Sequence, residues 1–145
     1  MSNIIIEQHA GITVLRDDLL PGGTKSILLP SLIDEHEEYV YASPVYGAFQ
    51  IALSIYCQSV GKKATIFCAK RNKRHKNTTT CEIYGAKIVE VPYGYLSVVE
   101  KSASNYAWKT GAKKIQFGGQ TEENINLIAA RMRQITELLG YEPQN

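Results

Sequence analysis

Residues 64–91 read ATIFCAKRNKRHKNTTTCEIYGAKIVEV, and this stretch decides the fold class of the 145-residue chain. Its two ends, Ala64–Cys68 and Lys87–Val91, are short apolar runs typical of β-strands. Between them Asn77–Tyr84 predicts a short helix, with Asn77 as its N-cap and Gly85 after its end. A strand, a helix and a second strand joined by short connections predict two parallel strands with a right-handed crossover.

The same unit repeats on both sides of this stretch. Apolar residues recur at helical spacing in three further segments, each next to a short apolar run. The expected strands are 39–42, 64–68, 87–91 and 113–117, and the expected helices are 49–60, 77–84, 99–107 and 121–139, the last with one face formed by Ile125, Ile128, Met132, Ile135 and Leu139. This alternation predicts a three-layer α/β fold with an open, mainly parallel sheet and helices on both faces.

The first 38 residues read differently from the rest. Ile4–Glu7 and Ile12–Leu15 predict two strands joined at Ala10-Gly11, and Ser26–Glu38 predicts a helix that is kinked at Pro30 or begins near it. We expect a single α/β domain over residues 1–145. Residues 1–38 contribute the N-terminal strands and a lysine turn, and residues 39–145 contribute the repeated strand–helix units.

Composition restricts the class of protein. A hydrophobic share of 44% and a charged share of 21% are those of a folded domain, and a net charge of +2 indicates no particular partner. Cys57, Cys68 and Cys81 form no metal or disulfide pattern, and the histidines share no metal spacing, so no metal is expected. Without a signal peptide or a long apolar run, the sequence predicts a cytoplasmic protein that does not enter a membrane.

The lysine turn is the first candidate site. In Arg16-Asp-Asp-Leu-Leu-Pro-Gly-Gly-Thr-Lys-Ser26, Lys25 follows two glycines that allow the backbone to approach a ligand closely. A desolvated lysine there has the chemistry of a Schiff-base nucleophile. The alternative is a surface turn with a solvated lysine. Asp17 and Asp18 have the chemistry of metal ligands, but beside Arg16 they favour turn and capping bonds.

Three loops follow predicted strands and precede predicted helices. They are residues 42–47, 69–76 and 118–121. In open parallel sheets, ligands bind beyond the carboxyl ends of the strands, where backbone N–H groups face an anion.

The order of these segments resembles the N-terminal half of fold-type II pyridoxal-phosphate-dependent enzymes, and most closely the aminocyclopropane-carboxylate deaminase and D-cysteine desulfhydrase branch. Four segments carry the resemblance: 16–25 with its glycine-lysine turn, 41–61 with a loop that opens a helix, 64–69 with 84–94 (YGAKIVEVPYG), and 113–119 with its Gly-Gly end. The family's sequence continues beyond this half, so the chain is expected to be a truncated member.

The resemblance implies a lyase or deaminase that acts on an amino acid. Lys25 is the implied catalytic residue and carries pyridoxal phosphate as a Schiff base. The resemblance implies cofactor binding at Thr24, Ser43, Tyr46 and Gly47, with Ser43 and the backbone near Tyr46 and Gly47 also facing the substrate carboxylate. From the residues themselves, Gly118 and Gly119 are cofactor-binding candidates that could hold an anion, with a tight turn as the alternative. Tyr93 and Tyr95 are substrate-binding candidates that could stack on a ring or donate a proton, with plain packing as the alternative. Thr24 replaces the family's asparagine, and Ile27 stands where an arginine is common. The family's phosphate-binding loop and the partner of its pyridine nitrogen belong to the missing half.

Three explanations of that gap stay open: a homo-oligomer, a separate partner chain, or a fold kept after catalysis was lost. The feature that favours another role is the basic loop, defined as Lys70, Arg71, Lys73, Arg74 and Lys76. It predicts a non-catalytic binding or assembly protein that recognises a phosphate-bearing partner or nucleic acid. A solubilising loop is the alternative, and few nearby aromatic residues are placed to stack on bases.

Overall fold

Four parallel strands form the sheet at the centre of the fold. The structure is a computed structural model that describes residues 4–92 and 94–140. The strands are β3 (Glu38–Ala42), β4 (Lys63–Ala69), β5 (Lys87–Val91) and β6 (Lys113–Lys114), and their spatial order is β5-β4-β3-β6. Every pairing in this sheet is parallel, which confirms the predicted α/β class.

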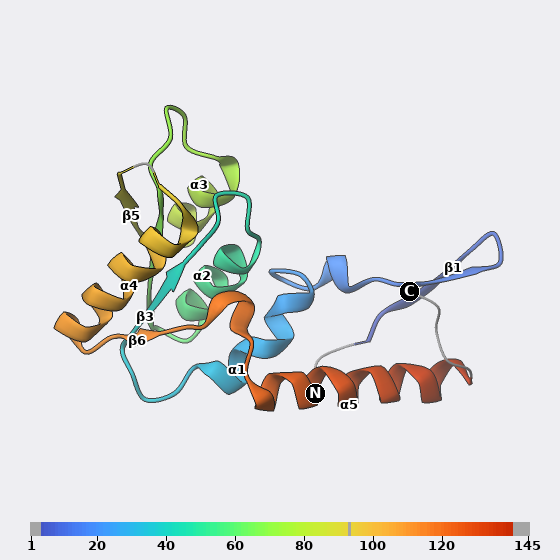
Figure 1. Cartoon of the computed structure of the whole chain (residues 1–145). Coiled ribbons are helices and arrows are strands. Elements are labelled where there is room, and N and C mark those ends of the chain that lie inside the picture. Colours follow the sequence, from blue (N-terminus) through green and yellow to red (C-terminus); the bar gives the residue numbers. More distant parts are fainter. Residues whose placement is uncertain (1–3, 93, 141–145) are drawn as a thin grey trace.

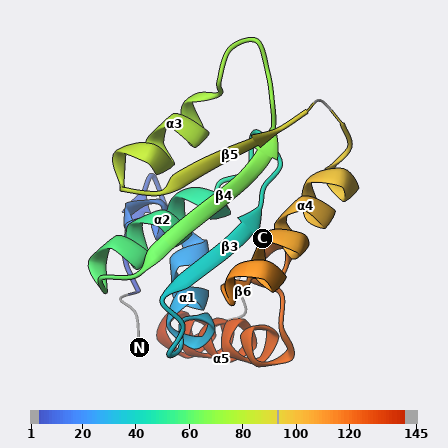
Figure 2. The same cartoon turned by 90° about the vertical axis from the view of Figure 1, so that its left-hand side faces the viewer.

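Helices cover both faces of the sheet, as alternation along β3 requires. Tyr39 and Tyr41 face one side, where they pack with α1 (Leu29–Leu32), α2 (Phe49–Ser59) and α3 (Lys76–Ile83). Val40 and Ala42 face the other side, where they pack with α4 (Leu96–Thr110). Figure 2 shows β5, β4 and β3 side by side, with α4 lying across one face. The predicted three-layer arrangement is therefore present.

The N-terminal segment contains less helix than the sequence predicts. β1 (Ile6–His9) and β2 (Ile12–Leu15) form an antiparallel hairpin, followed by 3-10 turns at Asp17–Leu19 and Thr24–Leu28. The predicted helix over 26–38 is wrong in extent, because α1 has only four residues. Pro30 lies in its first turn, as expected, while the Ser26 hydroxyl donates to the Gly23 carbonyl at 2.7 Å and keeps the preceding turn tight.

The C-terminal helix packs two residues of the predicted face, Ile128 and Ile135, but exposes others. α5 spans Glu122–Leu139, with Thr121 as its N-cap. Ile125 is 64% exposed and Met132 is also exposed, whereas Asn124 and Arg131 are buried. The reason is that these two side chains form hydrogen bonds or ion pairs with polar partners on the packed side of the helix. Figure 1 shows that α5 and the β1–β2 hairpin both extend away from the sheet in the same direction.

Two boundaries also differ from expectation. β6 ends at Lys114 instead of residue 117, because the chain enters a 3-10 turn at Phe117–Gly119 with positive φ at both glycines. α3 is capped by His75, whose Nδ1 accepts a hydrogen bond from the Asn77 amide at 3.1 Å, so Asn77 is not the N-cap. No helix among residues 4–92 and 94–140 is both long and apolar enough to cross a membrane.

Candidate functional site

The strand order creates a switch point beside β3. From β3 the chain moves outward to β4 and β5 and then returns across the sheet to place β6 on the other side of β3. Ligands of open parallel sheets bind beyond the strand ends at such a point. Here the Gly118 amide donates to the Tyr41 hydroxyl at 3.0 Å, so the segment after β6 is attached to β3.

The lysine turn is fixed against α2. Gly22 has φ +83°, and a Cβ added there would lie 2.8 Å from the Cα of Ala52. The Gly23 amide donates to the Leu20 carbonyl at 2.8 Å, which closes the turn. Only glycine allows this backbone to lie so close to a helix with a left-handed φ. The position of the next residues, Thr24 and Lys25, follows from this contact.

Lys25 meets the Gly118-Gly119 turn. Both Lys25 and Thr24 are exposed, and the Lys25 Nζ lies 3.8 Å from the position that a Cβ at Gly118 would occupy. Gly118 and Gly119 are both buried. A Cβ at Gly119 would lie 2.9 Å from the Phe49 ring, so this turn is held between α1 and α2. The structure thus brings a free amine next to a side-chain-free stretch of backbone.

Ser43 is turned into its own loop. It is buried, and its hydroxyl donates to the Pro44 carbonyl at 2.7 Å. The Gly47 amide donates to the same carbonyl at 3.0 Å, and a Cβ at Gly47 would lie 3.0 Å from the Ser43 Oγ. Ser43 and Gly47 therefore lie together. Within the described ranges, no hydrogen bond or ion pair joins Ser43 to Lys25.

The remaining predicted ligand residues lie on the β4–β5 side of the switch point. Tyr46 is largely exposed and lies under Arg71. Tyr95 is 85% exposed and borders a cavity of about 370 Å³ with Ala69, Arg71 and Gly94. Tyr93 lies outside the described residues.

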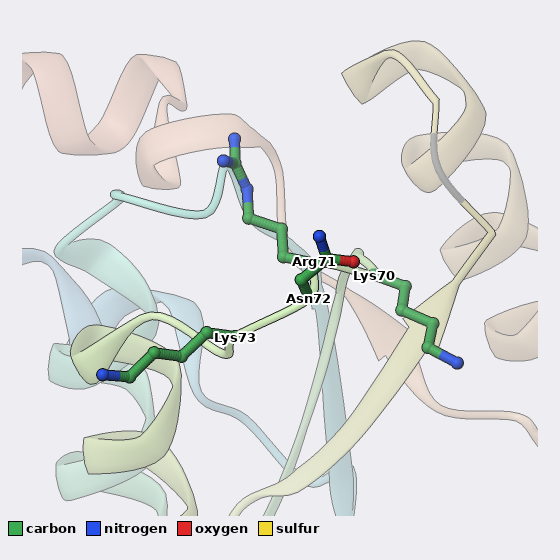
Figure 3. Close-up of a pocket in the computed structure, with 4 residues that line it drawn as sticks. All are labelled: Lys70, Arg71, Asn72 and Lys73. Atoms are coloured by element: carbon green, nitrogen blue, oxygen red, sulfur yellow. The ribbon is translucent and has the colours of Figure 1, made fainter.

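The basic loop is not one continuous cationic surface. Arg74 forms ion pairs with Glu82 at 3.0 Å and Glu90 at 3.1 Å, and its hydrogen bond to Glu90 raises the pKa of its guanidinium. Arg74 therefore links α3 to β5. Figure 3 shows Lys70 and Lys73 pointing in opposite directions, with Arg71 directed between them. Lys76 is exposed at the start of α3.

The acidic residues of the lysine segment make ion pairs. Arg16 binds Asp18 through two hydrogen bonds of 2.9 Å, as the turn-bond interpretation predicts. Asp17 binds Arg131 of α5, whose side chain is only 3% exposed. Sequence reasoning missed this pair, although Arg131 lies three residues after Ile128 and four before Ile135, a spacing that indicates the packed face.

Another cluster of acidic side chains lies near the amino ends of β3 and β6. Asp34, Glu35 and His36 offer ligand atoms within 4.8 Å of one another. The Asp34 carboxylate accepts hydrogen bonds from the Lys113 ammonium at 2.8 Å and the Tyr39 hydroxyl at 2.8 Å. These hydrogen bonds occupy the Asp34 carboxylate, and they connect the 33–37 segment to β3 and β6.

Comparison with known proteins identifies the fold. No family model and no curated protein matches the sequence. Solved structures of fold-type II pyridoxal-phosphate-dependent enzymes do match the structure. An aminocyclopropane-carboxylate (ACC) deaminase homologue has a TM-score of 0.61 at 20% identity over 74% of this chain and 37% of its own.

Two further structures give the same result. O-ureido-L-serine synthase has a TM-score of 0.60 at 20% identity, over 77% of this chain and 40% of its own. The O-acetylserine-dependent cystathionine beta-synthase from Helicobacter pylori has a TM-score of 0.58 at 15% identity, over 78% and 43%. The chain spans less than half the length of each, and the likeness at this identity is one of fold.

Proposed function

We propose that this chain, which has the fold seen in part of the fold-type II pyridoxal-phosphate-dependent enzymes, holds pyridoxal phosphate through Lys25 and acts on an amino acid as a lyase or deaminase. The observation that supports the proposal is the approach of the Lys25 Nζ to Gly118, at the switch point of the sheet. A Cβ at Gly118 would lie 3.8 Å from the Lys25 Nζ and 3.9 Å from the Gln120 Cγ, so glycine at this position keeps the backbone open to the amine.

The residues present fit the aldehyde end of the cofactor. Lys25 supplies an accessible amine, and the buried glycines at 118 and 119 keep side chains away from it. Pyridoxal phosphate, when bound, withdraws electrons from an amino acid, and the protein decides which bond breaks. The turn at Gly22 and Gly23 orients the lysine. The Gly47 amide and the Ser43 hydroxyl hold the 43–47 loop in place through their hydrogen bonds within that loop. A second copy or a partner chain supplies the rest of the site in this proposal.

The test is a pyridoxal-phosphate titration, followed by borohydride reduction and peptide mapping. We expect a visible absorption band and a reduced adduct on Lys25. Lys25→Arg keeps the charge but removes the reactive amine and abolishes both signals, while Lys109→Arg, the same change in the last turn of α4, leaves them intact. If a second copy completes the site, the apparent affinity rises with protein concentration. An adduct spread over the basic loop contradicts the proposal.

A non-catalytic binding protein is the second candidate. It is favoured by the cations of the basic loop, because within the described residues Lys70, Arg71, Lys73 and Lys76 form no ion pair. Such a protein gives no cofactor band and binds an anionic partner with an affinity that falls as salt rises.

A further inference from the structure

Arg71 has surroundings unlike those of the other cations in the basic loop. Arg74 is held by two glutamates, and Lys70 and Lys73 point apart, although they line a cavity of about 670 Å³ together with Arg71 and Asn72 (Figure 3). The Arg71 guanidinium instead lies over the Tyr46 ring, with its Cζ 5.2 Å from the ring centroid. No carboxylate in the described part of the chain pairs with it. Its N–H donors are therefore available to an external oxyanion.

The surface beneath Arg71 is itself fixed. The Tyr46 ring meets the His75 ring edge-on, with centroids 4.7 Å apart. The Tyr46 carbonyl accepts a hydrogen bond from the Asn77 side chain at 3.1 Å, which ties the 43–47 loop to the start of α3. A guanidinium stacked on an anchored ring loses less conformational freedom on binding than a lysine in solvent. The loop therefore presents one pre-positioned fork of donors.

Arg71 also lines the hollows at the carboxyl ends of β3, β4 and β5. One cavity, of about 370 Å³, has Ala69, Gly94 and Tyr95 as its other walls. A second, of about 240 Å³, shares Ala69, Arg71 and Gly94 with the first and extends to the 43–46 segment, Leu96 and Val99. Together they reach the size range of small-molecule sites, roughly 300–1,000 Å³. Their walls are apolar apart from Arg71 and a few hydroxyl and backbone groups.

We propose that Arg71 and Tyr95 form a binding site for a small oxyanion that carries a flat ring, namely an aromatic carboxylate or an aromatic phosphate monoester. The planar guanidinium donates two parallel hydrogen bonds to the oxyanion. The ring lies against Tyr95, an aromatic side chain that is almost fully exposed without a ligand. The site shares Tyr95 and the 43–46 segment with the cofactor- and substrate-binding candidates, but it needs neither Lys25 nor a bound cofactor, so it can be tested independently of the proposed catalytic function.

The geometry favours a small ligand over a nucleic acid. A polyanion is bound by cations that follow its backbone, each neutralising one phosphate. Here the neighbours of Arg71 diverge, and Arg74 is already neutralised. A single arginine at the edge of an apolar hollow matches one anionic group joined to one ring.

The experiment titrates the whole chain with four probes and follows its amide and Arg71 side-chain signals by NMR. The probes are benzoate, phenyl phosphate, inorganic phosphate and benzyl alcohol, none of which has an aldehyde that reacts with Lys25. We expect benzoate or phenyl phosphate to bind at least about tenfold more tightly than inorganic phosphate or benzyl alcohol. The stronger of the two identifies the anionic group.

Variants assign the binding to the proposed residues. Arg71→Gln weakens the ring-bearing anion about tenfold or more, and Arg71→Lys restores only part of the affinity because the donor fork is lost. Lys70→Gln and Lys73→Gln remove the same charge from the same loop and leave binding within about twofold, which the diverging side chains predict. Tyr95→Ala reduces the affinity for the ring-bearing probes to that for inorganic phosphate. All four positions are exposed, so thermal unfolding confirms that the variants fold.

Three results overturn the proposal. Equal losses in Arg71→Gln, Lys70→Gln and Lys73→Gln show diffuse charge attraction. An affinity for inorganic phosphate equal to that for the stronger of benzoate and phenyl phosphate excludes a ring-specific site. Chemical-shift changes that avoid residues 69–71 and 94–96 place the ligand elsewhere.

Discussion

Gly22→Ala is the substitution whose cost the structure defines most sharply, and Gly23→Ala is its matched control. Both glycines have positive φ, +83° and +74°, and Gly23 has ψ −160°, so alanine at either position is held in a backbone region that favours glycine, at about 1–3 kcal/mol. Only at Gly22 does the new Cβ meet another part of the chain. It would lie 2.8 Å from the Cα and 2.9 Å from the Cβ of Ala52, whereas nothing lies within 4 Å at Gly23.

The contact at Gly22 cannot be relieved by rotating a side chain, because its nearest atom belongs to the backbone of α2. Pushing the lysine turn away from the helix adds an overpacking cost of about 1–3 kcal/mol. We therefore expect Gly22→Ala, which adds overpacking to backbone strain, to lower the free energy of unfolding by about 2–5 kcal/mol, and Gly23→Ala, which adds backbone strain alone, to lower it by about 1–3 kcal/mol.

Urea unfolding followed by circular dichroism measures both variants, and an unchanged slope against urea shows that only stability has changed. Because Lys25 lies three residues after Gly22, the yield of cofactor adduct on Lys25 should fall in the same order as stability. Equal destabilisation by the two variants would refute the reasoning, since it would mean that the turn is not held against α2.

Three further predictions concern ionisable groups. Asp17→Asn removes one partner of a buried ion pair with α5 and should cost about 3 kcal/mol in urea unfolding. Asp18→Asn, at an exposed pair, should cost much less, and equal costs would contradict the burial of the first pair. The hydrogen bond from Lys113, with a second from a neighbouring histidine, holds the pKa of the Asp34 carboxyl well below its usual range. The stability that this carboxylate contributes is present above about pH 4 and is lost as the pH falls further, so Asp34→Asn should flatten the decline of the urea midpoint from pH 5 to pH 2, and parallel curves would argue against it. Burial raises the pKa of the Cys57 thiol to about 12, so a disulfide reagent at pH 8 should modify it only after urea unfolding, and rapid labelling of the folded chain would show that the thiol is accessible.

The fold class was predictable because its signals are local. Lys87–Val91 is rich in β-branched residues and follows a helix that ends before a glycine. The observed strand has the predicted bounds. Thr121 and Gly140 likewise mark the ends of α5. The extent of α1 was not predictable in this way, because a proline is compatible with both a kink and a helix start. Short-range hydrogen bonds on both sides of α1, from Ser26 to Gly23 and from Tyr39 to Asp34, accompany the short helix.

The candidate site was less predictable, because long-range contacts build it. The resemblance named Lys25 and the Gly118-Gly119 turn separately, but only the strand order brings them together. The basic loop showed which residues carry charge but not that Arg74 is neutralised by Glu82 and Glu90. The apolar spacing along α5 placed Ile125 and Met132 inside, and it missed the polar side chains that occupy the packed face.

The ion pair between Asp17 and Arg131 also bears on the order of folding. It connects residues 114 positions apart, and contacts of such high sequence separation form slowly because a long loop must close first. The 3-10 turn at Asp17–Leu19 can therefore settle only after α5 has formed. During synthesis on the ribosome the sheet can assemble from β3 to β5, and the lysine turn can dock on α2, while Asp17 still lacks its partner. Pulse-labelled hydrogen exchange should accordingly show the amides of residues 17–20 gaining protection after those of residues 22–28.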